Sequence, residues 1–291
     1  MASINRFRVW VAIGVMWTMV SIGRAQESSG TGSLAKPFYE SGIALTGQGD
    51  FEGAIVDLSK AIEIDPKNST FYSARGNARN NLGLLDEAIA DFTKAIELDG
   101  TRRVPYINRG VAKVDKGDLD GALADYSKVI MLDPKNATAY RNRGCVQQQK
   151  GDFDSARSDF QQSIQLSTDE GAYQRFYLFL IGLRQKSGAS SGAELKLVVN
   201  RWKDGWKKTV GLFLAGDVNE ALFFELAAQG TPKVVRDQKC EAFYYAGSLR
   251  LSKGDNTGGK ELLERCVATQ LHTFPEFQLA RSELIRIGSK P

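Results

Sequence analysis

The residues best suited to catalysis or metal binding in this sequence are one histidine and three cysteines. A Ser-His-Asp or Cys-His site would have to use His272, and no serine or cysteine has the local context of a nucleophile. A single histidine also excludes a histidine-rich metal site, and neither a CxxC nor an HExxH motif occurs. We therefore predict no metal and no cofactor, and interpret His272 as a turn residue.

One string imitates a phosphate-binding loop. Residues Gly254 to Lys260, GDNTGGK, have the G-x-x-x-x-G-K spacing, but Glu261 stands where a Ser or Thr hydroxyl would bind Mg²⁺. Such a loop also follows a strand, whereas residues 243–251 have helical spacing. We interpret the match as accidental. Nothing supports a paired-carboxylate hydrolase either, so we predict that the chain is not an enzyme.

The elements that would position any functional side chain repeat every 34 residues. Each copy contains a glycine and an alanine, whose small size lets two short helices approach near the lower end of the usual ~8–10 Å spacing. A larger residue four places after the alanine fills the space towards the neighbouring copy. The residues in phase are Gly42, Gly76, Gly110 and Gly144, then Ala54, Ala88, Ala122 and Ala156, then Leu58, Phe92, Tyr126 and Phe160.

This helix–turn–helix pattern, present four times over residues 35–168, resembles the tetratricopeptide repeat (TPR) family. The resemblance implies an all-α solenoid, a right-handed superhelix of helical hairpins. One hairpin cannot bury its own apolar face, so neighbouring hairpins stack to form the core. The resemblance further implies that the first helices of successive hairpins line a concave groove.

The groove positions implied by the resemblance are polar and rich in amides on this sequence. An asparagine amide carries both a donor and an acceptor, so a row of amides would hold an extended peptide by its backbone. Amides that are simply solvated, or bonded to neighbouring loops, are the alternative. The candidate peptide-groove residues are Ser73, Asn77, Asn80, Ile107, Asn108, Arg141, Asn142 and Gln148.

Basic residues do not follow the pattern of TPR proteins that clamp a C-terminal carboxylate. Val104 and Asn108 stand where two of the cations of that clamp would be, so we do not expect one here. Arg75, Arg109 and Arg143 recur just before the glycine instead. We expect them to pair with acids of the second helices, namely Asp91, Asp125 and Asp159.

The first 25 residues have the pattern of an export signal. A basic start precedes an apolar run of about 14 residues, and Gly23 and Ala25 are the small residues expected before cleavage after Ala25. This run is shorter than the ~20 residues needed to cross a bilayer as a helix, so we predict cleavage, with an uncleaved membrane anchor as the alternative. Residues 26–34 are expected to form a flexible leader. The mature chain is then periplasmic or secreted.

The charge of the chain gives no reason to expect a nucleic acid partner. The formal net charge is +4, but removing the three arginines of the first 25 residues leaves 35 basic against 34 acidic residues. A nearly neutral chain lacks the basic surface that binds phosphates. Membrane association is expected only if the export signal is retained.

After Thr168 the strict repeat ends, but helical spacing continues. We predict an irregular helical segment over residues 169–237, with residues 232–237 as a linker. A divergent TPR-like hairpin and a capping helix, from about 275 to 287, are expected within residues 238–291. Two short motifs lie in this part, LFLAGD at residues 212–217 and CEAFYYAG at residues 240–247. They resemble exported bacterial TPR adaptors of the NlpI-like type, although the lipid-attachment cysteine of those proteins is missing. That resemblance implies a non-enzymatic adaptor that holds envelope enzymes or their substrates.

The cysteines divide into a candidate pair and a single residue. Cys240 opens the first helix of the divergent hairpin and Cys266 lies near the end of its second, so the two meet in an antiparallel arrangement. We predict a disulfide, which suits an exported protein, with two unpaired thiols as the alternative. Cys145 lies at a groove position, where we interpret it as a small buried hydrophobe and not as a reactive thiol.

Taken together, the sequence predicts an exported, non-enzymatic TPR scaffold or adaptor that binds a partner polypeptide in its concave groove, in the assembly or regulation of cell-envelope enzymes. One alternative is a structural protein that forms homo-oligomers through its first repeat or its cap. The other is an enzyme with a site in residues 169–237.

Overall fold

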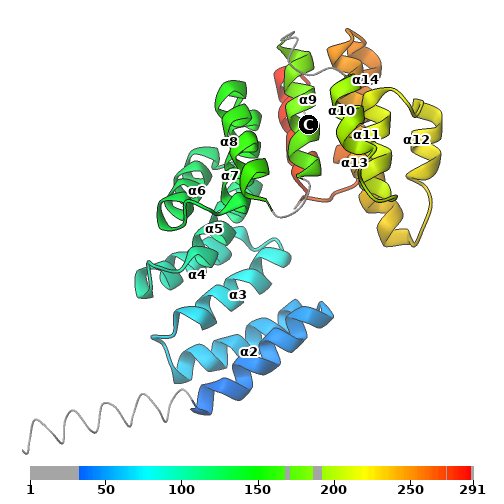
Figure 1. Cartoon of the computed structure of the whole chain (residues 1–291). Helices are drawn as coiled ribbons and strands as arrows, with labels where there is room; N and C mark the ends of the chain where they lie inside the picture. The colour runs from blue at the N-terminus through cyan, green and yellow to red at the C-terminus, as the bar shows by residue number, and fades with distance from the viewer. Residues whose placement is uncertain (1–32, 168–170, 186–191, 273, 290–291) are drawn as a thin grey trace, which may run out of the picture. The chain divides into compact units, whose positions relative to one another are not determined.

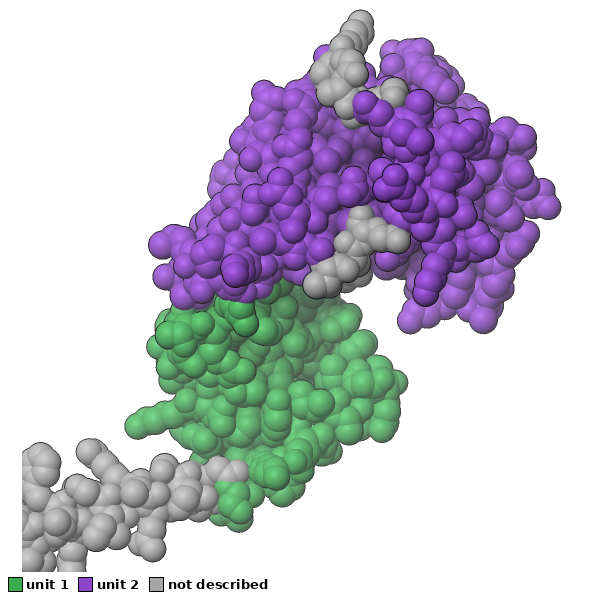
Figure 2. Space-filling model, viewed as in Figure 1, with its two compact units in different colours: residues 1–108 green, residues 109–291 purple. Residues whose placement is uncertain are grey.

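Every regular element in the described part of the chain is a helix (Figure 1). The computed structural model describes residues 33–167, 171–185, 192–272 and 274–289. The all-α class is therefore confirmed, whereas the expected export signal over residues 1–25 lies outside the described residues. The chain divides into two compact units, residues 1–108 and 109–291 (Figure 2). Each unit is described by itself.

The first unit consists of helical hairpins. Its helices are residues 33–48, α2 (Phe51–Ile64), α3 (Ser69–Asn81), α4 (Leu85–Leu98) and the first part of α5 (Arg103–Lys116). Two of these helices begin with a side-chain N-cap. The side chain of Asp50 accepts a hydrogen bond from the backbone N–H of Gly53 at the start of α2, and the side chain of Asn68 accepts one from the backbone N–H of Thr70 at the start of α3. Alanines and Leu58 form a buried cluster between the helices.

The glycine of each repeat permits the close helix packing that its spacing predicts. A Cβ atom added to Gly76 in α3 would lie 2.8 Å from the ring of Phe92 in α4. In the second unit, a Cβ added to Gly110 would lie 2.7 Å from the ring of Tyr126. Such distances are far inside van der Waals contact, so a side chain at either position would push the two helices apart.

The second unit begins with two further hairpins and continues into a larger helical assembly. Its helices are the rest of α5, α6 (Leu119–Leu132), α7 (Ala137–Lys150), α8 (Phe153–Leu166), α9 (Ala172–Arg184), α10 (Gly192–Val199), α11 (Trp206–Ala215), α12 (Glu220–Leu226), α13 (Pro232–Ser252), α14 (Asn256–Val267) and α15 (Pro275–Arg286).

The prediction of a linker at residues 232–237 is wrong. These residues form the start of α13, a continuous helix of 21 residues. Pro232 occupies the first turn, where its missing N–H costs no hydrogen bond, and Thr231 caps the helix by accepting from the N–H of Val234. Proline therefore marks the beginning of a helix here and not a break between helices.

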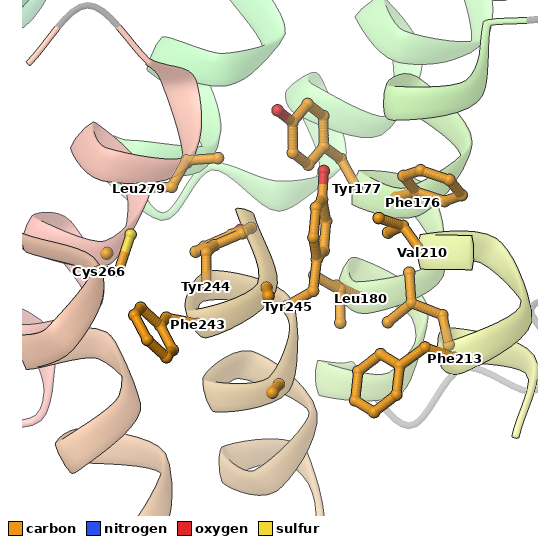
Figure 3. Close-up of a cluster of buried hydrophobic side chains, with 14 of the residues drawn as sticks. Phe176, Tyr177, Leu180, Val210, Phe213, Phe243, Tyr244, Tyr245, Cys266 and Leu279 are labelled. Atoms are coloured by element: carbon orange, nitrogen blue, oxygen red, sulfur yellow. The ribbon is translucent and has the colours of Figure 1, made fainter. Parts of the chain in front are cut away.

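Aromatic side chains form the core of the second unit. In Figure 3, Phe176 and Tyr177 from α9 lie beside Tyr245 from α13, and the ring centroids of Phe176 and Tyr245 are 5.6 Å apart. Phe160 from α8, the last repeat, belongs to the same buried cluster. The last repeat and the C-terminal helices thus share one core.

A helix is present where the capping helix was predicted, as α15 (Pro275–Arg286), and its capping role stays a prediction. It packs against both helices of the divergent hairpin, α13 and α14, and it also packs against α7, the first helix of the fourth repeat. Since the first helices carry the predicted groove residues, this second contact decides which of them remain accessible.

Candidate functional site

The arginines before the glycines pair with aspartates of the second helices and join the two helices of each hairpin, as predicted. Arg75 donates from Nε and Nη2 to the two carboxylate oxygens of Asp91, at 3.0 and 2.8 Å. Arg143 bonds Asp159 in the same bidentate way, at 2.7 and 2.8 Å, and Arg109 pairs with Asp125. Because the three aspartates are buried, these pairs satisfy charges that water cannot reach.

In the first unit, two predicted groove residues on successive first helices contact each other. The side-chain Nδ2 of Asn108 in α5 donates to Oδ1 of Asn77 in α3, at 2.7 Å. Both residues are half-buried. The Oδ1 atom of Asn80, one turn along α3, is buried and has no hydrogen-bond partner in the described part of the chain.

The two other groove residues of the first unit are less accessible or less polar. Ser73 is only 7 % exposed, so it offers little surface to a partner, and Ile107 is half-buried. Among the predicted groove residues of this unit, the accessible polar groups are therefore the asparagine amides of α3 and α5.

In the second unit, Gln148 does not face an open groove, contrary to the interpretation from the sequence. It is 4 % exposed, and its Nε2 donates to the hydroxyl of Tyr244 in α13 at 3.1 Å. Its backbone carbonyl accepts from Arg286 of α15 at 3.2 Å. The C-terminal helices thus occupy the side of α7 on which this residue lies.

Arg141 and Asn142, the remaining predicted groove residues, line a cavity of about 230 Å³ beside the start of α15. Gln278 of α15 crosses towards α5, where its Nε2 donates to Oδ1 of Asp115 at 2.8 Å. Burial raises the pKa of Asp115 to about 6, although the bond from Gln278 and the charge of Arg281 act against the shift.

Cys145 and the single histidine, His272, line the same cavity. Cys145 is buried, as expected, and burial raises the pKa of its thiol to about 12. The charge of Arg141 opposes this shift without reversing it. Since the thiolate is the nucleophilic form of cysteine, Cys145 is not an activated nucleophile at neutral pH.

Two buried glutamates form a polar cluster that sequence reasoning missed. Glu276 accepts from the hydroxyls of Tyr177 and Tyr245, at 2.6 and 3.0 Å. Glu241 accepts from Nε1 of Trp206 at 2.9 Å and from the hydroxyl of Tyr173 at 3.2 Å. Burial raises the pKa of both carboxyl groups, that of Glu241 to about 8. The sequence did contain a sign of this cluster, because each glutamate is a lone acid among apolar residues, Glu241 in CEAFYY and Glu276 in FPEF.

The candidate cysteine pair is close in space. Cys240 and Cys266 are fully buried, and their sulfur atoms lie 3.3 Å apart as two thiols. The hairpin of α13 and α14 therefore brings the two residues together as the sequence indicated. The disulfide itself stays a prediction.

No group of three or more His, Cys, Asp or Glu side chains among the described residues has the arrangement to hold a metal ion. None of the helices in the described ranges combines the length and the apolar character needed to span a membrane.

Two models of tetratricopeptide repeats match the chain within residues 42–170. A family model described as TPR repeat matches residues 42–83 and 110–151, and one described as tetratricopeptide repeat matches residues 69–102 and 137–170. No curated protein matches the chain.

Two solved structures share the fold over most of the chain. A tetratricopeptide repeat protein from Parabacteroides merdae is 16% identical, with a TM-score of 0.59 over 87% of this chain and 100% of its own. PilF of Pseudomonas aeruginosa is 15% identical, with a TM-score of 0.53 over 87% of this chain and 99% of its own. At these identities the similarity concerns the fold alone.

Proposed function

Because this chain is a tetratricopeptide repeat protein, we propose that it is an exported, non-enzymatic scaffold that binds a partner polypeptide through the first helices of its repeats. The binding residues are Asn77, Asn80 and Asn108 of the first unit. The partner binds as an extended chain, by its backbone.

The observation that carries this proposal is the bond between Asn108 and Asn77. It uses one donor and one acceptor, which leaves Nδ2 of Asn77 and Oδ1 of Asn108 without a partner among the described residues. A peptide N–H and C=O complement these two groups. The bond also holds both side chains in one orientation, which lowers the entropy lost when a peptide binds.

The chemistry of the second unit supports a role without catalysis. The thiol that shares a cavity with the single histidine is protonated at neutral pH. Residues 169–237, where an enzyme site would have to lie, contain a cavity lined by Ala172, Tyr173 and residues 202–207. No serine, cysteine or histidine is among these lining residues, so the cavity holds neither a Ser-His nor a Cys-His pair.

The binding test uses peptides selected on the wild-type protein from a random library displayed on phage. We expect the double variant Asn77→Ala/Asn108→Ala to lose at least about tenfold in affinity, or about 1.4 kcal/mol. Asn200→Ala, at an exposed asparagine outside the repeats, is the matched control and should bind as the wild type does. Equal binding by the double variant and the wild type would reject these amides as the site.

Export is tested on the full chain with a C-terminal tag, produced in a bacterium. Mass spectrometry of the envelope fraction should find a chain that begins at Gln26, because the sequence places small residues before that position. A full-length chain in the membrane fraction would support the anchor instead, and a full-length chain in the cytoplasm would reject export. Capture of partners from the same envelope fraction would then test a role with envelope enzymes.

Self-assembly is the second candidate, and exposed apolar residues of the first unit favour it. Leu34, Ile43 and Val56 are all exposed although large and apolar. If these residues mediate stacking between copies, light scattering should show a mass that rises with concentration, and Leu34→Ser/Val56→Ser should abolish the rise. A monomer at all concentrations would remove this candidate.

A further inference from the structure

A cavity between the starts of α9 and α11 combines aromatic and basic side chains in its lining. It has a volume of about 550 Å³, within the range of small-molecule sites. Tyr173, Trp202 and Trp206 contribute three aromatic side chains to its wall, and Lys203 and Lys207 contribute two cations. Nothing in the proposed scaffold function uses this cavity.

A buried carboxyl group holds two of the aromatic rings. Glu241 is 8 % exposed, and the two side chains that donate to it are Tyr173 and Trp206, both of which line the cavity. Burying a carboxyl group is costly, and two hydrogen bonds offset part of that cost. The arrangement fixes the direction of both rings before any ligand arrives.

The rings are also packed from behind. The indole of Trp206 stacks on Phe223 with parallel planes and centroids 5.3 Å apart. Trp202 meets Phe176 edge to face at 5.7 Å. The aromatic wall is therefore part of the core and does not need to rearrange to form a binding surface.

The mouth of the cavity carries net positive charge. Lys203 and Lys207 are exposed, and the ammonium of Lys207 lies 5.4 Å from the centroid of the Tyr173 ring. Asp204, the one acid of the lining, is already paired with Lys208 at 3.0 Å. Helix α11 starts at Trp206 after Gly205, which provides no side-chain cap, so its first N–H groups add partial positive charge.

We propose that this cavity binds a small organic anion made of a single six-membered ring and one carboxylate. The ring lies against Tyr173 and Trp206, and Lys203 and Lys207 hold the carboxylate. Two sources share this chemistry, acidic sugars and aromatic acids.

The test uses the tryptophan fluorescence of the full chain. The sequence contains four tryptophans, two of them, Trp10 and Trp17, in the export signal. Trp10→Phe/Trp17→Phe in the uncleaved chain, or cleavage after Ala25, leaves Trp202 and Trp206, both in the cavity wall, as the source of the signal. Glucuronate and benzoate serve as probes, with the uncharged glucose and benzamide as their matched controls. We expect one of the anions to change the fluorescence saturably, at a concentration at least about tenfold below its uncharged control.

Variants then locate the binding. Lys203→Ala/Lys207→Ala should weaken binding at least about tenfold. Because both side chains are exposed, the chain should stay folded, with only the small loss that removing the contact of Lys207 with the Tyr173 ring causes. Lys233→Ala, an exposed lysine of α13 outside the lining, should bind as the wild type does. A response to glucuronate assigns an acidic sugar, and a response to benzoate an aromatic acid. No saturation by either anion up to about 10 mM, equal responses to charged and uncharged probes, or unchanged binding by the double variant would each overturn the proposal.

Discussion

The side-chain amide of Gln148 donates a hydrogen bond to the hydroxyl of Tyr244, 96 residues further along the chain. Both side chains are buried, and the bond joins the first helix of the last repeat, α7, to the C-terminal hairpin. A residue at a predicted groove position is thus part of the attachment of the C-terminal helices. A first-helix position can therefore bind a partner or attach the C-terminal helices, and the sequence pattern does not distinguish these two roles.

Gln148 should therefore matter for stability and not for partner binding. Gln148→Ala removes a buried hydrogen bond, which should lower the free energy of unfolding by about 1–3 kcal/mol. Urea unfolding and binding of the selected peptides measure the two effects. Asn77→Ala/Asn108→Ala should show the opposite pattern, with weaker binding and a small change in stability. Weaker peptide binding by folded Gln148→Ala would place the groove in the second unit instead.

The Arg143–Asp159 pair should contribute far more than an exposed ion pair. Arg143→Ala leaves a buried carboxylate without its bidentate partner, which should cost about 3 kcal/mol in urea unfolding. Lys94→Ala is the control, because its ion pair with Glu97 is exposed and should be worth less than about 1 kcal/mol. Similar losses in the two variants would contradict a structural role for the repeated arginines.

The second unit should become more stable as the pH falls from about 8 towards 5. The pKa of Glu241 is raised to about 8 from the ordinary 4.5, so between these values the folded state holds a proton that the unfolded chain has lost. Each extra proton makes the free energy of unfolding fall by about 1.4 kcal/mol per unit rise in pH.

Urea unfolding at several pH values tests this dependence. Glu241→Gln should flatten it only in part, because the pKa of Glu276 is raised as well. If the variant and the wild type have the same pH dependence, Glu241 does not titrate in this range.

The number of cysteines that react with a thiol reagent tests the predicted disulfide between Cys240 and Cys266. Protein recovered from the envelope fraction and unfolded without reductant should react with a thiol reagent only at Cys145, and at all three cysteines after reduction. Oxidation removes two protons and two electrons from Cys240 and Cys266, and the disulfide of an oxidoreductase would accept them. Three reactive thiols before reduction would contradict the bond.

The bond should also add stability. Closing a loop of about 25 residues contributes roughly 3 kcal/mol. The free energy of unfolding of the wild type should therefore be higher in oxidising than in reducing buffer. Cys240→Ser/Cys266→Ser should show no such difference between the two buffers, whereas Cys145→Ser should still show it.

The repeats were predictable because their contacts are local. Gly110 and Tyr126 are 16 residues apart, as are Arg109 and Asp125, and each contact lies within one hairpin. Helical spacing decides which side chains of a hairpin meet, so the period predicted the arginine–aspartate pairs, and the family that this period resembles implied the fold class. The asparagine pair of the first unit is different, because Asn77 and Asn108 are 31 residues apart and join the first helices of two successive hairpins. Its role in binding stays a prediction.

By itself, the sequence determined a helical repeat with small residues at the helix contacts and paired charges between its helices. Only the tertiary structure decided that α15 lies against α7, that Gln148 is buried, and that Glu241 holds the rings of Tyr173 and Trp206. The physical reason is sequence separation. The residues that make these contacts are 35 to more than 130 positions apart in the sequence. No local period relates residues at such separations, so only the packing of the whole core brings them together.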